Sequence, residues 1–307
     1  EIQYDMYHTL IGAEHPTLIG YWIFDDAVVG EPIKDASEAN SAIVNGAPIS
    51  FVSTIAVMSQ AVPGFGSAIH FDGIDDYVSV DSIAETLAAA TACTYSAWVR
   101  PDGTGSGPDA WMAVNTSTGG NRVLLRYDHG RMKFEVYSPT VGDGGYTYST
   151  NTFDSDQWHH VALSVGEEVG GMQPAILYVN GQVEAEFDIP TANRPQADDQ
   201  FSIGQEYDGA AKSDFFVGMI DEARVWAVMR TQEEIQADMH RTLSGQEADL
   251  IGYWSMDDGK GATCLWNAAD ENLHGVVFGG PLFVTSSIPV HYVTDVDTPV
   301  SSVLFGS

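Results

Sequence analysis

Two related segments lie about 233 positions apart, and this spacing is the strongest constraint on the fold. Residues 1–12 match residues 234–245 at eight of twelve positions. The match continues from LIGYWIFDD (18–26) to LIGYWSMDD (250–258), and from GAPI (46–49) to GGPL (279–282). Solenoid repeats have periods of ~20–50 residues, so this period indicates tandem copies of a whole domain. We expect the chain to be a piece of such an array.

Between the two copies the sequence is typical of short β-strands. Nine segments are rich in β-branched and aromatic residues and are bounded by Gly, Asp, Asn or Pro, namely 67–73, 76–80, 93–101, 121–128, 131–138, 158–166, 175–189, 201–205 and 218–228. Asn180-Gly181 predicts a type I′ hairpin, because both central residues of that turn need positive φ. Asp128-His129-Gly130 predicts a looser one. This pattern predicts an all-β sandwich of two antiparallel sheets.

One helix is predicted, over residues 232–243. Thr231 and Glu234 form a capping box, and Ile235, Met239 and Leu243 recur at helical spacing before Gly245. Residues 1–10 repeat this pattern and are expected to end the helix of a preceding unit.

The charge balance excludes some partners. Twelve Lys and Arg against 43 Asp and Glu give a net charge of −31 over 307 residues. Nucleic-acid binding and adhesion to anionic lipid both need basic residues in excess, so neither is expected. No apolar stretch is long enough to insert into a membrane, and any signal peptide is expected to lie outside this sequence. Cys93 and Cys264 show no metal-site spacing, and the sequence does not decide whether they pair.

Six motifs together resemble the laminin-G-like, concanavalin-A-like jelly-roll domains: GYWIFDD, SAIHFDGIDDYVSV, TYSAWVRPDG, DQWHHVALSV, LYVNGQ and GMIDEARVWAVMRTQEEI. The resemblance covers most of residues 17–245 and implies a two-sheet antiparallel jelly roll, secreted or on the cell surface, in carbohydrate-binding or adhesion proteins. Residues 293–307 resemble the start of a cadherin-like repeat of large bacterial surface proteins. We therefore expect a preceding helix end (1–16), the jelly roll (17–245), a repeated GYW segment (246–285) and a linker into the next module (286–307).

The second GYW segment leaves an alternative open. Either residues 17–49 open the jelly roll and 250–283 begin a successor, or 250–283 close it and 1–49 belong to a predecessor. Both copies can also pack, one at each sheet edge, which would protect edge strands from pairing with other chains.

Acidic residues in two motifs predict a calcium site. Asp72, Asp75 and Asp76 lie in FDGIDDYV, and Asp221 lies in MIDEARVW. Calcium needs several oxygen ligands from turns that wrap it, and the resemblance implies such a site near the rim of the sandwich. The alternative is that these carboxylates cap turns or pair with Arg100 or Arg224.

A catalytic site is not expected. Glu184, Glu186 and Asp188 alternate along one strand, as do the carboxylates of jelly-roll glucanases. However, their order differs, and in laminin-G-like domains this is an outer strand and not a cleft, so a solvated face is the better interpretation. His159-His160 lacks zinc spacing, and one histidine is expected to be exposed while the other is partly buried.

Four of the twelve basic residues fall on one predicted hairpin: Arg122, Arg126, Arg131 and Lys133. Together with Trp111, Tyr127, Tyr146 and Tyr148 they predict a rim that holds an acidic sugar through Arg contacts. The alternative, which we favour for the charges, is internal pairing with Glu135, Asp128 and the acidic surroundings. Trp111 and Trp266 are predicted as sugar platforms, and the other tryptophans as core.

The sequence therefore predicts a non-catalytic, calcium-supported glycan-binding or adhesion module from a tandem array. A spacer domain that contacts only neighbouring domains of the same chain is a second hypothesis. A polysaccharide hydrolase is a third, which the missing catalytic triplet disfavours.

Overall fold

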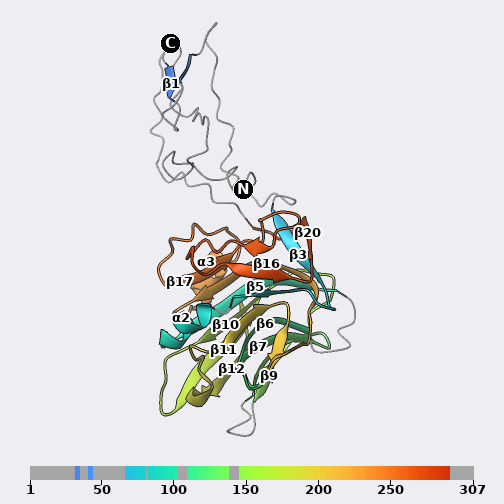
Figure 1. Ribbon diagram of the computed structural model, residues 1–307. Coiled ribbons are helices and arrows are strands. Elements are labelled where there is room, and N and C mark those ends of the chain that lie inside the picture. Colours follow the sequence, from blue (N-terminus) through green and yellow to red (C-terminus); the bar gives the residue numbers. More distant parts are fainter. Residues whose placement is uncertain are drawn as a thin grey trace. The chain divides into compact units, whose positions relative to one another are not determined.

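The computed structural model describes residues 32–34, 41–43, 66–80, 82–102, 109–137 and 145–290. The chain divides into two units, Glu1–Gln60 and Ala61–Ser307. In the first, β1 (Pro32–Lys34) pairs antiparallel with β2 (Ser41–Ile43). The second is a sandwich of two antiparallel sheets, which confirms the predicted fold class (Figure 1). The predicted cadherin-like start at 293–307 lies outside the described residues.

The first sheet, here called the β5 sheet, has the strand order β12-β11-β10-β5-β16-β3-β20, with β17 also paired to β16. Its strands are β3 (Ser67–Asp72), β5 (Cys93–Pro101), β10 (His159–Val165), β11 (Met172–Val179), β12 (Gln182–Pro190), β16 (Val217–Trp226), β17 (Leu250–Trp254) and β20 (Leu282–Thr285).

The second sheet, here called the β6 sheet, has the order β18-β19-β4-β13-β6-β7-β8-β9. Its strands are β4 (Tyr77–Ser79), β6 (Asp109–Asn115), β7 (Asn121–Asp128), β8 (Arg131–Tyr137), β9 (Tyr146–Tyr148), β13 (Gln200–Ile203), β18 (Cys264–Leu265) and β19 (Gly275–Phe278). A separate hairpin joins β14 (Glu206–Asp208) to β15 (Ala211–Ser213).

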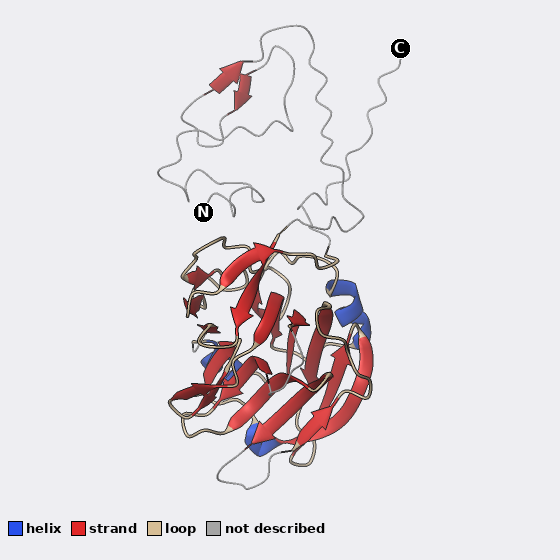
Figure 2. Cartoon of the chain, turned by 90° about the vertical axis from the view of Figure 1, so that its right-hand side faces the viewer, coloured by secondary structure: helices blue, strands red, loops and turns tan. Residues whose placement is uncertain are grey.

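One main apolar core lies between the sheets, because alternate residues of each strand point inward. Val161 and Leu163 of β10 face it, while Ala162, between them, packs instead with Tyr178 and with Ile235 of a helix. This covering explains why β10 is buried along its whole length. The helices lie at the margins of the sandwich, as Figure 2 shows: α2 (Ile83–Ala89), α3 (Gln232–Asp238) and the 3-10 turn η1 (Thr191–Asn193).

Helix α3 has the predicted capping box but ends five residues earlier than predicted. Thr231 Oγ1 accepts from Glu234 N, and a Glu234 carboxylate oxygen accepts from Thr231 N. At the other end, the buried Arg224 guanidinium donates to the carbonyls of Asp238 (2.7 Å) and Arg241 (2.6 Å). This side chain therefore satisfies the Asp238 carbonyl at the end of the helix.

Two predicted turns have the expected backbone. Asn180 and Gly181 have φ of +51° and +70°, as a type I′ hairpin requires. His129 and Gly130 are also left-handed, at +50° and +82°, so the looser predicted turn is a tight one as well.

The second GYW segment is part of this sandwich. Strand β17 pairs with β16, and β20 pairs with β3. Strand β19 pairs with β4 on one side and with β18 on the other. We call Leu250–Thr285 the closing segment. The sandwich therefore extends beyond the boundary predicted at residue 245, since these pairings complete both sheets.

The predicted linker from residue 286 begins as a packed strap. Ile288 and Val290 are buried against Trp98 and pack with Trp158, and the Pro289 carbonyl lies 2.9 Å from His240 Nδ1. Ser286 N donates to the Gly66 carbonyl (3.1 Å). The point where the chain enters β3 therefore lies beside the point where it leaves β20. The cysteines do not pair: Cys93 is buried and Cys264 exposed. In the part of the chain that is described, no helix is long and apolar enough to cross a membrane.

Candidate functional site

The turn that carries the chain from β3 to β4 brings three carboxylates together. One carboxylate oxygen from each of Asp72, Asp75 and Asp76 lies within 4.8 Å of the others. Asp72 N donates to Asp76 Oδ2 (3.1 Å), and Ile74 N donates to Asp72 Oδ1 (2.8 Å). Asp72 and Asp75 are exposed and Asp76 is buried. We call these three residues the acidic turn.

A second crossover packs against the acidic turn. Gly279 follows β19 with φ of +83°, and a Cβ there would lie 2.4 Å from Asp76 Oδ1 and 2.5 Å from the Asp75 carbonyl oxygen. Burial raises the pKa of Asp76, and the hydrogen bond from Asp72 N partly opposes this rise. Converging carboxylates of this kind are the donor set that a hard cation such as calcium prefers.

Asp221 does not belong to this group. Asp72 pairs with Val217 of β16, and Asp221 lies four residues further along that strand, roughly 13 Å away at ~3.3 Å per residue. Asp221 is 2% exposed; one of its oxygens accepts from Ser286 Oγ and the other from Glu222 N. Burial, and then the Glu222 carboxylate, raises the pKa of Asp221 well above its usual value. Asp221 is therefore removed from the predicted metal ligands, and the metal site at Asp72, Asp75 and Asp76 stays a prediction.

Strand alternation divides the predicted sugar rim. Trp111 and Tyr127 point into the main core and are 0% and 3% exposed. The Tyr127 hydroxyl donates to the Phe153 carbonyl (2.9 Å) inside the protein. Neither ring offers a face to a ligand, so both predictions are wrong.

Arg126 lies on the opposite face from Tyr127, but its own partners surround it. It is 7% exposed; Nη2 lies 2.6 Å from Glu206 Oε1 and also contacts Asp214, and Nη1 lies 3.8 Å from Glu135. Its predicted contact with a sugar is therefore wrong, and the favoured internal pairing describes it. These contacts tie the β14–β15 hairpin to β7.

Two acids near Arg126, Glu206 and Asp109, have pKa values above the usual range of carboxyls. Burial raises the pKa of Glu206 to about 8, although Arg126 opposes this rise. Burial and the Asp214 charge raise the pKa of Asp109 to about 6. One guanidinium therefore does not neutralise all of its neighbours.

An accessible patch remains on β8 and β9. Tyr146 is 65% exposed, and its ring lies edge-on to Tyr148 with centroids 5.6 Å apart. Lys133 Nζ lies 5.0 Å from the Tyr146 ring centre, and Arg131 Cζ lies 5.5 Å from that of Tyr148. We call Arg131, Lys133, Tyr146 and Tyr148 the tyrosine patch.

The patch is held in place by hydrogen bonds and ion pairs. The Tyr148 hydroxyl donates to Asp128 Oδ2 (2.7 Å), Lys133 pairs with Glu135 (2.8 Å), and Arg131 Nη2 donates to the Thr150 carbonyl (3.1 Å). The i, i+2 spacing of Tyr146 and Tyr148 is the sequence signal that places both on one face.

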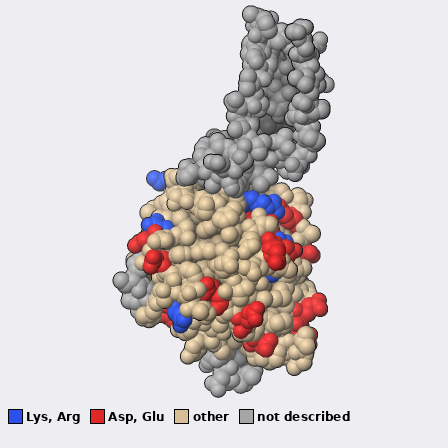
Figure 3. Space-filling model, turned by 180° about the vertical axis from the view of Figure 1, so that it is seen from behind, with Lys and Arg blue, Asp and Glu red and all other residues tan. Residues whose placement is uncertain are grey.

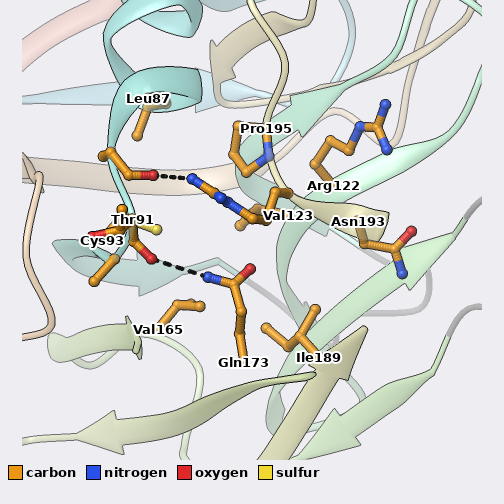
Figure 4. Close-up of a pocket in the computed structure, with 13 residues that line it drawn as sticks. Leu87, Thr91, Cys93, Arg122, Val123, Val165, Gln173, Ile189, Asn193 and Pro195 are labelled. Atoms are coloured by element: carbon orange, nitrogen blue, oxygen red, sulfur yellow. Dashed lines mark hydrogen bonds between the residues drawn. The ribbon is translucent and has the colours of Figure 1, made fainter. Parts of the chain in front are cut away.

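The hollow drawn in Figure 4 is too small for a sugar. It lies between the end of α2 and the chain around η1, where Gln173 Nε2 donates to the Thr91 carbonyl (3.3 Å) and Arg194 to that of Ala90. Its cavity volume of about 20 Å³ suffices for a single water.

The remaining candidates have structural partners. Glu184 is buried and accepts from Asn151 N and Nδ2 (2.9 Å each), whereas Glu186 and Asp188 are exposed on edge strand β12. His159 and His160 are both buried, contrary to the prediction that one is exposed. Burial, followed by the Arg224 charge, lowers the pKa of His160 well below its usual value. Trp266 is 41% exposed and lies against His274, with ring centroids 4.2 Å apart.

Acidic side chains form several separate groups on the face shown in Figure 3, with few basic groups between them.

Comparison with known proteins gives a family match and several similar folds. The Laminin_G_3 model, described as the concanavalin A-like lectin/glucanases superfamily, matches residues 72–236, which is more than half of the chain. A structure titled a putative carbohydrate binding protein from Bacteroides ovatus is 21% identical with a TM-score of 0.56, covering 75% of this chain. This chain spans 62% of that protein's length.

Two further structures are less similar. A heptameric SAP-like pentraxin from Limulus polyphemus has 15% identity and a TM-score of 0.46, covering 73% of this chain and 93% of its own. Domain 4 of the extracellular arabinanase AbnA from Geobacillus stearothermophilus, in complex with arabinotriose, has 15% identity and a TM-score of 0.41. The match covers 71% of this chain and 96% of that domain. No curated protein matches the chain.

Proposed function

The chain belongs to the concanavalin A-like lectin/glucanases superfamily, and we propose from this that it is a non-catalytic carbohydrate-binding module. The observation that carries the proposal is the tyrosine patch, in which the exposed Tyr146 shares one face of the β6 sheet with the half-buried Tyr148, Arg131 and Lys133. The Bacteroides ovatus protein, described as carbohydrate binding, supports the same class of ligand.

The chemistry of the patch suits a sugar. The apolar face of a pyranose packs on an aromatic ring, and Tyr146 offers most of its surface. Arg131 supplies guanidinium donors beside it, which also favour a carboxylate on the sugar. Because Glu135 and Asp128 already surround Lys133, Arg131 is the cation we assign to an acidic substituent.

Calcium is proposed to support the module at the acidic turn. Asp72 and Asp75 are exposed carboxylates beside the buried Asp76, and the turn connects the two sheets. A cation there would neutralise mutual repulsion and brace the crossover. Its role in sugar binding would be indirect, through the order of the sandwich edge.

A glycan array, probed once in millimolar calcium and once in chelator, tests this function. We expect Tyr146→Ala and Arg131→Ala to abolish binding. Phe278→Ala, which removes an exposed ring at another edge of the same sheet, should leave it unchanged. Silence of the unmodified protein in both conditions would contradict the proposal. Binding that disappears in chelator would show that sugar binding depends on calcium, as the proposed bracing of the sandwich edge requires.

The packed strap favours a spacer as the second candidate. Ser286–Val290 fixes the exit of the chain on Trp98 and Trp158, which suits a domain that holds its neighbours in a set arrangement. Hydrolysis is disfavoured because Glu184 is occupied by Asn151 and its neighbours lie on an edge strand. The acidic composition agrees with a secreted or cell-surface array of bacterial adhesion modules.

A further inference from the structure

The closing segment exposes apolar side chains at the edge of the β6 sheet that lies opposite the tyrosine patch. Within β19, Val277 packs against the main core, so Val276 and Phe278 point to the outer face. Val276 is 49% exposed and Phe278 is 41% exposed. Trp266, which follows β18, is also 41% exposed, and no other tryptophan among the described residues is exposed to this extent. Neighbouring apolar side chains that stay in contact with water indicate a surface for a ligand.

Each of the two exposed rings is backed by a second ring. Phe278 stacks on Tyr77 of β4, with ring centroids 4.6 Å apart and an angle of 10° between the planes. Trp266 lies against His274, with ring centroids 4.2 Å apart. Because the backing ring covers one face of each exposed ring, the opposite face is the one that a ligand reaches. Such a supported face is the kind of surface on which a sugar packs.

Backbone contacts fix the ring pair of Trp266 and His274. Trp266 N donates to Asp258 Oδ1 (2.8 Å), and Asn267 N donates to His274 Nδ1 (3.0 Å). Since Nδ1 accepts this hydrogen bond, the neutral His274 ring carries its proton on Nε2. A hydrogen-bond donor for a sugar hydroxyl therefore lies next to the Trp266 ring.

The two ring pairs lie at the two ends of β19. His274 and Phe278 are four residues apart, which corresponds to roughly 13 Å at ~3.3 Å per residue. Val276 lies between them on the same face and opposite Ser79 of β4. We call Trp266, His274, Val276 and Phe278 the aromatic strip. Its length exceeds that of a single sugar ring, so both ring pairs are reached together only by a chain of several sugars.

The charges around the aromatic strip disfavour an anionic ligand. Asp258 lies at the Trp266 end, and the acidic turn packs against Gly279, directly after Phe278. Lys212 is the cation on the Phe278 side, with Nζ 5.4 Å from the Tyr77 ring centre. The aromatic strip therefore has no excess of positive charge to hold an anionic polysaccharide, in contrast to the tyrosine patch.

The aromatic strip is too small for a protein partner. Each of its three large apolar side chains is at most 49% exposed. A whole aromatic side chain buries about 150–250 Å², so the three together offer well below the ~800 Å² that each partner contributes to a standard protein interface. A sugar chain is held instead by ring faces and a few fixed polar groups, which the aromatic strip supplies.

We propose that the aromatic strip is a second carbohydrate site, which binds a long uncharged polysaccharide across both ring pairs. This inference rests on the proposed function as a carbohydrate-binding module and adds a separate site with a different ligand. The two sites lie at opposite edges of the β6 sheet, on β18–β19 and on β8–β9.

Occupation of both ring pairs by one chain makes the second contact intramolecular. The affinity for a long polysaccharide therefore exceeds that of either ring pair alone, by up to about 10²–10⁴-fold. A short array glycan reaches one ring pair only and is held weakly there. For this reason Phe278→Ala leaves the array binding at the tyrosine patch unchanged.

Affinity electrophoresis of the full chain tests the aromatic strip, with soluble xylan, mannan, arabinan or β-glucan in the native gel and polygalacturonate as the anionic probe. We expect at least one of the uncharged polysaccharides to retard the protein. Phe278→Ala and Trp266→Ala should each weaken the apparent affinity at least about tenfold. Phe278→Tyr keeps a ring and should retain the affinity. Val183→Ala, which removes a side chain of β12 with 42% exposure, is the matched control and should leave it unchanged.

A double variant with Tyr146→Ala and Arg131→Ala separates the two sites, and it should bind the uncharged polysaccharide as the unmodified protein does. The proposal is overturned if none of the four uncharged polysaccharides retards the unmodified protein, or if retardation survives the Trp266→Ala, Phe278→Ala double variant. Retardation that Tyr146→Ala abolishes would assign the polysaccharide to the tyrosine patch and equally overturn it. Array binding of acidic glycans without retardation by uncharged ones would reject the aromatic strip alone and leave the proposed function standing.

Sedimentation velocity of the same variants examines a second copy of the chain as the occupant. We expect the unmodified protein and Phe278→Ala to sediment alike. A dimer that Phe278→Ala dissociates would assign the aromatic strip to a contact between copies and reject the polysaccharide. Equal melting temperatures of the variants and the unmodified protein would show that any loss of binding is not a loss of folding.

Discussion

Two groups of carboxylates in this protein come from similarly acidic motifs, and burial gives them different roles. The acidic turn exposes Asp72 and Asp75 to solvent, whereas Asp221 and Glu222 are each 2% exposed. The buried pair is held by specific partners: Ser286 for Asp221, and Arg224 with Tyr253 for Glu222. An acidic motif in the sequence therefore does not distinguish a candidate metal site from a structural network. The solvent exposure of its carboxylates does.

The largest expected effect comes from breaking the buried group. Arg224→Ala removes the cation that lies 2.5 Å from Glu222 and the donor to the end of α3. Leaving a buried carboxylate without its partner costs about 3–5 kcal/mol, which we expect in the free energy of unfolding measured with urea. The double variant Arg224→Met, Glu222→Gln should recover much of the loss. A loss below about 1 kcal/mol for Arg224→Ala would show that Glu222 does not need its charge partner.

The pH dependence of the free energy of unfolding tests the contrast between buried and exposed carboxylates. Burial raises the pKa of Asp257, which accepts from Ser67 N at 2.6 Å, to about 7. A carboxyl whose folded pKa lies above its unfolded value stabilises the protein at low pH, and this stability is lost as the pH rises toward 7. We expect the free energy of unfolding to fall between about pH 4 and 7, by at most about 1.4 kcal/mol per pH unit from this group.

Asp257→Asn keeps an oxygen for Ser67 N and should flatten that slope, as measured by urea unfolding at each pH. Asp188→Asn, an exposed carboxylate of β12, is the control and should retain the slope. Equal slopes in all three proteins would assign the pH dependence to other groups.

The smallest expected effect concerns the exposed group. Asp75→Asn should change the stability without calcium by no more than about 0.5 kcal/mol, because the side chain is exposed. It should abolish the rise in melting temperature on adding calcium, a rise that corresponds to about 2.7 kcal/mol at one hundred times the dissociation constant. Glu186→Gln should leave that rise intact. A rise that survives Asp75→Asn would remove the acidic turn as the calcium site.

The sequence predicted the sandwich because its signals are local. The turn at Asn180-Gly181 and the capping box at Thr231 depend on residues a few positions apart, and both form as predicted. The end of α3 was missed because it involves Arg224, which lies on β16 before the helix and donates to the Asp238 carbonyl, a contact that helical periodicity does not reveal.

The candidate sites were harder to predict because they depend on which way each strand faces. Strand alternation already places Tyr127 and Arg126 on opposite faces, so they cannot share one rim. The burial of both Asp221 and Glu222 was not predictable, since a bulge in the β16–β5 ladder interrupts the alternation there and Glu222 has a φ of +52°. The burial of Arg126 depends on the β14–β15 hairpin, which sequence periodicity does not place.

The paired ends of β3 and β20 have a mechanical consequence. Ser67 lies opposite Thr285, and β20 is the outermost strand of its sheet. Tension applied through the two flanking chains would open this ladder one hydrogen bond at a time, instead of loading all bonds together. The strap at Ser286–Val290 must detach from Trp98 before that opening begins. In a tethered array it is this short apolar contact, more than the length of the strands, that would set the force at which a unit starts to extend.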